Sequence, residues 1–451
     1  MNITPKKIFE DYLSDALPLS EAIDRLIFFV QESISIKKRI KSINLLAEIG
    51  LNDERVYNVL ENVLISDANE LVRNSAINAL FQLFPDESSY RPFKFALLNE
   101  DSLKIKQNVY KKLISILNNL TGQPNERDFL LEELSQMEVQ DFRVKFLELK
   151  KTGQLSQMAK SKLKDILINY LSYLYLKKSF WRIKITVDDL SITELRFIFK
   201  GLEGFPRPIK NLSDLNILVL RYNQLRNIPE WISSLSKLET LNLNVNNIKN
   251  IPESIGSLKN LKKLEMWKNA LIELPETIGN LSNLEILKLR INKIKDLPSS
   301  IGNLSSLLKL DCHDNNLKKL PSSIGRLENL NHLDLSWNYI SQLPSSMGNL
   351  VKLEDLRLEK NELVTLPSNL GGLKSLEILN LRENQLKEIP SSVGEITNLR
   401  ILNLSNNSLK MLPESLSRLI NLEHLHLGRN DEIKIPQKIK KMQNEGLKII
   451  I

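Results

Sequence analysis

The residues of this chain with the greatest capacity for chemistry are its histidines and the acidic residues beside them. The histidines are His313, His332, His424 and His426. His313 follows Asp311 by two residues, and His332 precedes Asp334 by two residues. If these segments are neighbouring β-strands, about 4.8 Å apart, the four side chains could form a mixed metal site. The competing interpretation is a polar surface that faces solvent. We adopt it because solvent-facing residues of such strands are polar by default and no residues that would support the ligands can be identified, and we expect no metal and no cofactor.

No established catalytic motif accompanies these residues. The chain lacks the phosphate-binding GxxxxGK[ST], the dinucleotide-binding GxGxxG, the GxSxG elbow and the zinc-protease HExxH. Its single cysteine, Cys312, excludes an internal disulfide and a cysteine-based metal cluster. We therefore expect a protein that is not an enzyme and has no catalytic residues.

The charge of the chain is unevenly distributed. Residues 191–451 carry 35 Lys and Arg against 28 Asp and Glu, whereas residues 1–190 carry 27 against 26. This excess favours acidic partners but falls short of the dense basic stripe typical of nucleic-acid binding. Residues 1–17 lack the apolar core of a signal peptide, and no apolar run is long enough to span a bilayer. We expect a cytoplasmic protein that binds neither membrane nor nucleic acid.

A strictly periodic repeat is the strongest pattern in the sequence, and it must position the residues named above. Prolines recur twenty-three positions apart at Pro206, Pro229, Pro252, Pro275, Pro298, Pro321, Pro344, Pro367, Pro390, Pro413 and Pro436. Asparagines and glycines keep the same step. A fixed period of this length indicates stacked coils, each of which buries its apolar face against its neighbours.

One repeat, residues 284–306, illustrates how each coil is expected to form. Leu287 and Leu289 alternate with polar residues, as in a short strand with one buried face. Asn292 follows where the chain leaves the strand, and its amide can bond backbone groups that would otherwise be buried and unpaired. Pro298 then fixes φ on the outer side, before an irregular or helical return. Stacked repeats therefore predict a parallel sheet with a ladder of asparagines.

The pattern LxxLxLxxNxLxxLPxxIGxLxxL resembles the leucine-rich repeat of Ras-scaffold, erbin/scribble and plant intracellular Ras-group proteins. Similar arrays occur in bacterial and archaeal proteins. The match covers residues 192–444, as eleven repeats of equal length. The resemblance implies an α/β solenoid with a curved parallel sheet on its concave face. It also implies protein partners, small GTPases or other signalling regulators among them.

The segments that flank the repeats are expected to close the two ends of the array. Residues 181–191 alternate in polarity and predict a capping strand, and residues 445–451 predict a C-terminal strand or cap. The apolar C-terminal segment either packs under the last coil or pairs with another chain. We expect a monomer, with a dimer through this edge as the alternative.

Residues 1–180 have a helical pattern instead. Segments around Arg39, Arg73 and Lys106 align at steps of thirty-four and thirty-three positions. Pairs of helices at this period resemble HEAT repeats, and a generic helical bundle is the alternative. We expect an α-helical, HEAT-like domain over residues 1–125 and a helical connector over residues 126–180.

The third, fifth and seventh positions of each expected strand face the concave side, and the eighth lies at its rim. Trp, Tyr and Arg at such positions are the types that anchor protein interfaces. Trp267 is the clearest candidate because it contributes nothing obvious to the core. Lys288 with Asp311, and Asp334 with Arg357, could pair across neighbouring strands. The candidate partner-binding residues are Arg221, Tyr222, Trp267, Lys288, Arg290, Asp311, His313, His332, Asp334, Trp337 and Arg357.

Taken together, these features favour a non-catalytic scaffold or adaptor that binds a protein on the concave face. The helical domain would supply a second docking surface, and two linked surfaces raise the effective concentration of one partner near another. The alternative is a regulatory protein that senses a peptide or other ligand, in which binding changes the relation of the two modules.

Overall fold

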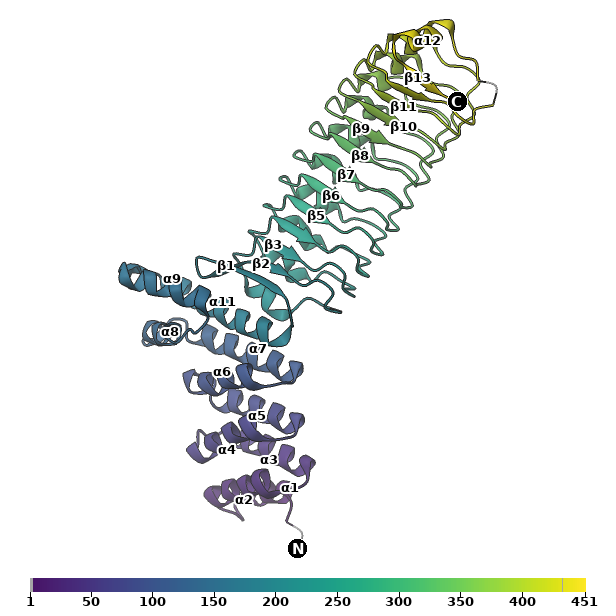
Figure 1. Ribbon diagram of the computed structural model, residues 1–451. Helices are drawn as coiled ribbons and strands as arrows, with labels where there is room; N and C mark the ends of the chain where they lie inside the picture. Colours follow the sequence, from purple (N-terminus) through teal and green to yellow (C-terminus); the bar gives the residue numbers. More distant parts are fainter. Residues whose placement is uncertain (1–2, 432) are drawn as a thin grey trace. The chain divides into compact units, whose positions relative to one another are not determined.

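The computed structural model describes residues 3–431 and 433–451. Residues 1–2 of the expected helical domain and residue 432 of the last expected repeat lie outside the described residues. The chain divides into two compact units, Met1–Arg182 with Val187–Ser191, and Ile183–Thr186 with Ile192–Ile451. The first is helical and the second is built on a parallel sheet (Figure 1). The predicted fold class, a helical N-terminal region followed by a repeat solenoid, is confirmed.

The first unit consists of helices that follow one another in chain order (Figure 1). The helices are α1 Pro5–Leu13, α2 Leu19–Glu32, α3 Ile36–Ile49, α4 Glu54–Ser66, α5 Glu70–Leu83, α6 Tyr90–Asn99, α7 Leu103–Asn119, α8 Glu126–Ser135, α9 Gln140–Lys151, α10 Gln154–Gln157 and α11 Lys160–Ser179. Short loops before α3, α5 and α7 end in polar N-cap residues: the Ser35, Asn69 and Ser102 side chains accept backbone N–H groups of the first turn.

The basic residues that mark the weak helical repeat of the sequence each bond a segment further along the helical unit. Arg39 pairs with Asp67, Arg73 pairs with Glu100 at 2.8 Å, and Lys106 donates to the Lys178 carbonyl at 3.1 Å. Arg39 and Arg73 each reach a residue just beyond the following helix, whereas Lys106 reaches α11, so only the first two contacts are equivalent. Helix α11 packs against α6, α7 and α8. The expected connector, residues 126–180, therefore continues the same unit.

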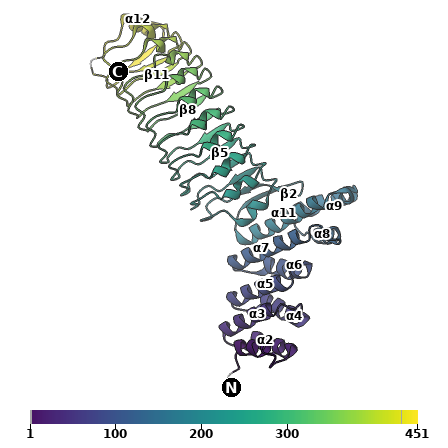
Figure 2. The same ribbon diagram turned by 180° about the vertical axis from the view of Figure 1, so that it is seen from behind.

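One sheet of 13 strands runs through the second unit in chain order (Figure 1 and Figure 2). From β2 to β12 the strands are parallel and in register, so that each residue lies beside its equivalent in the next coil. The strands are β1 Lys184–Asp188, β2 Ser191–Arg196, β3 Ile217–Val219, β4 Thr240–Asn242, β5 Lys263–Glu265, β6 Ile286–Lys288, β7 Lys309–Asp311, β8 His332–Asp334, β9 Asp355–Arg357, β10 Ile378–Asn380, β11 Ile401–Asn403, β12 His424–His426 and β13 Lys448–Ile450.

The two ends of the sheet lie in the segments expected to cap it. Strand β1 falls within residues 181–191 and lies next to β2. Strand β13 pairs in parallel with β12, after a short helix, α12 Gln437–Lys441, and Leu447 is buried. The C-terminal segment is thus part of the sheet, while Ile451 is 83% exposed.

The predicted asparagine ladder is present and its bonds interlock between coils. The Asn315 amide nitrogen donates to the carbonyl oxygens of Leu289 and Cys312 at 3.0 and 3.1 Å, and its Oδ1 accepts the N–H of Ile294 at 3.0 Å. The Cys312 carbonyl also accepts from Asn338, at 3.0 Å. Each carbonyl of this kind is therefore shared by two asparagines, which satisfies the backbone where the chain leaves the strand.

In the first ten coils the outer side is a short 3-10 turn that follows the proline, as in η6 Ser299–Asn303, whereas Pro436 of the last coil is followed by the helix α12. A Cβ atom on Gly302 would lie 2.2 Å from the carbonyl oxygen of Ser323 in the next coil. The φ of Gly302 is not in the left-handed region. The recurring glycine is therefore required by the close approach of neighbouring coils and not by a special backbone angle.

The eighth residue of every coil has a left-handed backbone, which the sequence analysis did not predict. Its φ lies between 53° and 59° at Phe199, Tyr222, Val245, Lys268, Ile291, Asp314, Trp337, Lys360, Glu383, Asn406 and Arg429. Few residue types tolerate this region, and β-branched residues such as Ile291 tolerate it least. The repeat geometry, and not the local residue, therefore determines this bend.

Candidate functional site

The exposed face of the sheet is formed by the third, fifth and seventh residues of each coil, bordered by the eighth. We refer to these positions as the concave face. In each strand from β3 to β12 the middle residue, for example Leu287 in β6, is buried, and its neighbours alternate with it across the sheet. All eleven candidate residues from the sequence occupy these positions, and five of them lie within strands β6 to β9.

Aromatic side chains and arginines gather at the start of this face, in a group that we name the aromatic–arginine patch: Phe199, Arg221, Tyr222, Trp267 and Arg290. Phe199, 71% exposed, stacks on Tyr222 with ring centroids 4.4 Å apart. Tyr222 meets Trp267 edge to face at 6.4 Å. The guanidinium groups of Arg221 and Arg290 lie 5.7 Å from the Tyr222 ring and 4.9 Å from the Trp267 ring. The patch is a continuous partly exposed surface.

A buried asparagine of the third coil bonds the backbone at Trp267. Asn244 stands at the seventh position between Tyr222 and Trp267 in chain order, and only 5% of it is exposed. Its Oδ1 accepts the backbone N–H of Trp267 at 3.0 Å. The Trp267 ring itself lies against Tyr222 and Arg290 and remains partly open to solvent.

Acidic side chains gather further along the face, in a group that we name the acidic centre: Asp311, Asp334, Asp355 and Glu359. Asp311 and Asp334 are direct partners in the register of β7 and β8. Burial raises the pKa of Asp311, and the charge of Asp334 raises it further. Burial also raises the pKa of Glu359, whose buried Oε2 finds no hydrogen-bond partner among the described residues. The ionised forms of Asp311 and Glu359 are therefore both disfavoured by their surroundings.

The histidines of this region do not form the group that their spacing suggested. His313 Nδ1 lies 2.7 Å from the Ser336 hydroxyl, whereas His332 Nδ1 lies 3.0 Å from Asp355 in the next strand. Burial alone would raise the pKa of Asp355, but hydrogen bonds from His332 and Arg357 outweigh it and hold that pKa below its usual value. Within residues 3–431 and 433–451, no three His, Cys, Asp or Glu side chains are placed to hold a metal ion.

The expected charge pairs across neighbouring strands also differ. Lys288 pairs with Glu265 at 2.8 Å and not with Asp311. Arg357 pairs with Asp355, two residues earlier on its own strand, at 3.0 Å and not with Asp334. Glu265 is the physical reason for the first difference, because it is 6% exposed and must be neutralised where it is buried. Burial would raise its pKa, but Lys288 and Lys263 lower it below its usual value.

The sequence analysis missed Asp355 and Glu359 of the acidic centre, and it also missed two residues that contact the aromatic rings of the face. Phe199 completes the aromatic–arginine patch, and Lys360 places its ammonium group 3.5 Å from the centroid of the Trp337 ring. Both occupy the eighth position of a coil, as do Tyr222 and Trp337, which the analysis did select. Reading that column through all eleven coils would have found them.

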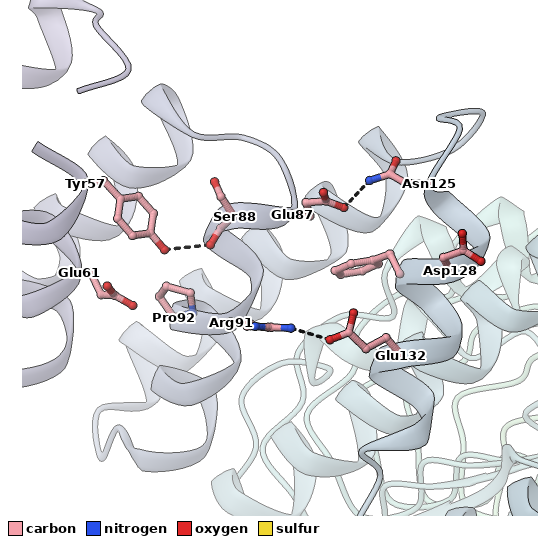
Figure 3. A pocket seen from close by; sticks show the side chains of 10 residues that line it. Tyr57, Glu61, Glu87, Ser88, Arg91, Pro92, Asn125, Asp128 and Glu132 are labelled. Atoms are coloured by element: carbon pink, nitrogen blue, oxygen red, sulfur yellow. Dashed lines mark hydrogen bonds and ion pairs between the residues drawn. The ribbon is translucent and has the colours of Figure 1, made fainter. Parts of the chain in front are cut away.

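The helical unit contains a separate hollow of about 550 Å³ between α4, α6 and α8 (Figure 3). Several of its polar groups bond one another. The Tyr57 hydroxyl donates to the Ser88 carbonyl at 2.9 Å, and Arg91 pairs with Glu132 at 2.6 Å across the opening (Figure 3). The walls are acidic but carry no grouping of a nucleophile with a base. The hollow could therefore accommodate part of a binding partner, but its lining residues form no catalytic site.

Family models match the part of the chain that forms this sheet. One described as "Leucine-rich repeat region" matches residues 206–290 and 310–383, and one described as "Leucine rich repeat" matches residues 374–431. The chain carries a leucine-rich-repeat domain. Both models lie within the repeats, so the HEAT-like resemblance of residues 1–125 and the Ras-group subtype of the repeats stay predictions. No helix among the described residues is long and apolar enough to cross a membrane.

Solved structures with leucine-rich repeats are also similar to this domain. A leucine-rich-repeat protein of Leptospira interrogans is 28% identical, with a TM-score of 0.37, over 56% of this chain and 82% of that chain. A plant peptide hormone receptor solved in complex with RGF2 is 32% identical, with a TM-score of 0.47, over 57% of this chain and 47% of that chain. An internalin of Listeria monocytogenes is 22% identical, with a TM-score of 0.42, over 57% and 86%. Comparison with curated proteins gave no match.

Proposed function

We propose that this protein is a non-catalytic scaffold or adaptor whose concave face binds a protein partner. The aromatic–arginine patch carries the proposal. Leucines, asparagines, prolines and glycines suffice to build a coil. The exposed aromatic rings and guanidinium groups are therefore not required for folding. Rigid aromatic side chains and arginines contribute most to binding energy at protein interfaces. A surface of this composition suits recognition of another protein.

The dimensions of the face agree with a macromolecular partner. Eleven strands about 4.8 Å apart give a surface on the order of 50 Å long. Small-molecule sites are compact clefts that enclose most of their ligand, unlike this open surface. The Ras-group resemblance suggests small GTPases or other signalling regulators as partners in the cytoplasm. That suggestion rests on analogy between repeats and does not fix the partner.

Affinity capture from a lysate of the source cells, read by mass spectrometry, tests this function. The full chain is compared with a variant that carries Trp267→Ala, Arg290→Ala and Trp337→Ala. A matched control carries Val351→Ala, Met411→Ala and Ile420→Ala, which are 47%, 61% and 81% exposed and lie outside the concave face. We expect at least one protein to be retained by the full chain and the control and lost with the concave-face variant.

The contrary result is equally clear. If every captured protein is retained by the concave-face variant, recognition lies in the helical unit or on the outer side of the repeats. Far-ultraviolet circular dichroism and thermal melting of all three proteins establish that the variants remain folded. These substitutions leave the repeat core intact, so we expect matching spectra.

A further inference from the structure

The two arginines of the aromatic–arginine patch differ from most cations on the same face. Arg196 pairs with Glu194, and Lys263 and Lys288 both pair with Glu265. Among residues 3–431 and 433–451, no ion pair or side-chain hydrogen bond is formed by the guanidinium group of Arg221 or Arg290, and both residues are exposed. Each guanidinium group lies against an aromatic ring instead. The ring orients the guanidinium plane but leaves its N–H donors free to bind a ligand.

The charge of the concave face changes sign along its length. In coils one to five, residues 192–306, its cations are Arg196, Arg221, Lys263, Lys268, Lys288 and Arg290, against the acids Glu194 and Glu265. In coils six to eight, residues 307–375, its acids are Asp311, Asp314, Asp334, Asp355 and Glu359, against the cations Lys309, Arg357 and Lys360. A ligand with carboxylates is therefore attracted to the first five coils and repelled by the next three.

We propose that the aromatic–arginine patch binds an extended acidic segment of a protein partner, with two carboxylates on Arg221 and Arg290 and an apolar side chain between them on Tyr222 and Trp267. An oriented guanidinium group binds a carboxylate through two parallel hydrogen bonds. The rings provide the apolar contact that a purely charged surface lacks. This inference rests on the proposed function and names the partner chemistry for it.

The spacing of the arginines sets the spacing of the carboxylates. Arg221 and Arg290 occupy the seventh position of the second and fifth coils. Three strand separations of about 4.8 Å place them roughly 14 Å apart along the sheet. An extended chain advances at most about 3.3–3.6 Å per residue, so roughly four residues span this distance. The segment therefore carries acidic residues four positions apart, with an apolar residue midway, as in Glu-x-Leu-x-Glu.

Fluorescence anisotropy with a short dye-labelled peptide tests the inference on the full chain. The probe carries the central sequence Glu-Ser-Leu-Ser-Glu, and two control peptides replace both Glu by Lys, or the Leu by Ser. We expect saturable binding of the probe alone, weakened about tenfold or more by Arg221→Gln and again by Arg290→Gln. Arg382→Gln, at the seventh position of the ninth coil, is the matched control and should leave the affinity unchanged.

Several results would overturn the inference. They are equal binding of the Lys peptide, an affinity insensitive to both patch arginines, or no binding of the probe at millimolar concentration. Tighter binding of a single-stranded oligonucleotide of matched length, falling steeply with salt, would also overturn it in favour of nucleic acid. If the probe does not bind but capture of a protein still depends on Trp267, the proposed function is supported and only the acidic partner segment is rejected.

Discussion

Replacement of Asn315 by alanine tests how the solenoid is held together. Asn315 is 3% exposed and lies in the sixth coil, between the coils that carry Trp267 and Trp337. Its side chain bonds the backbone of its own coil and of the preceding one. Alanine is smaller and removes the donor and the acceptor together, so the change deletes the hydrogen bonds of the ladder at this coil.

The expected loss follows from which backbone groups keep a partner. The N–H of Ile294 loses its acceptor, and an unsatisfied buried donor costs about 1–3 kcal/mol. The carbonyls of Leu289 and Cys312 each keep one bond, from Asn292 and Asn338, and lose the other. Each lost bond is worth about 0.5–1.5 kcal/mol. Asn315→Ala should therefore reduce the free energy of unfolding by about 2–6 kcal/mol.

Urea unfolding followed by tryptophan fluorescence measures this loss, and amide hydrogen exchange at Ile294 locates it. Asn283→Ala is the matched control, because its exposed amide donates only to the Lys259 carbonyl in the structure. We expect the control to stay within about 0.5 kcal/mol of the natural chain. Equal unfolding free energies for both variants, with unchanged exchange at Ile294, would refute the ladder as a stabilising element.

Three further predictions concern single positions of the repeat domain. Gly302→Ala should lower the free energy of unfolding in urea by about 1–3 kcal/mol, because the added Cβ meets the Ser323 carbonyl. Gly204→Ala is the control and should change this free energy little, because no atom of the described residues lies near its Cβ. Equal effects of the two changes would contradict the close approach of the coils at Gly302. Ile291→Asn should increase the free energy of unfolding by about 1 kcal/mol, and so raise the thermal midpoint, because Asn tolerates the left-handed backbone. A lower midpoint would show that Ile291 is not strained there. Asp311→Asn should stabilise the chain at pH 7, because the raised pKa of Asp311 marks an ionised form that folding disfavours. That gain should vanish as the pH falls below the ordinary pKa of an aspartate, and a variant less stable than the natural chain at pH 7 would contradict it.

The repeat fold could be predicted from the sequence because each coil repeats the same physical requirements. Apolar residues at alternate positions, Asn292 after the strand and Pro298 before the return each have one dominant structural role. The left-handed eighth position was missed because Lys268, Ile291 and Trp337 share no property that signals it. Its conformation comes from stacking between coils, which no local pattern encodes.

The candidate surface could be predicted by position but not by pairing. The repeat register places Trp267 and Arg290 on the concave face, since alternate strand residues share one side. The register does not predict which neighbouring group a long side chain pairs with. Lys288 selects Glu265 because that carboxylate is buried, and His332 selects Asp355 on the next strand. Such choices depend on burial and on rotamers that emerge only when all the coils are stacked.

The most direct test of the account is the affinity of the captured partner for the full chain and for Trp267→Ala. Ile420→Ala is the control, because Ile420 is a large apolar residue, 81% exposed, that lies outside the concave face. Isothermal titration calorimetry should give a partner affinity at least about 30-fold weaker for Trp267→Ala, as for an interface hot spot, and unchanged for Ile420→Ala. An unchanged affinity for Trp267→Ala would contradict recognition by the concave face.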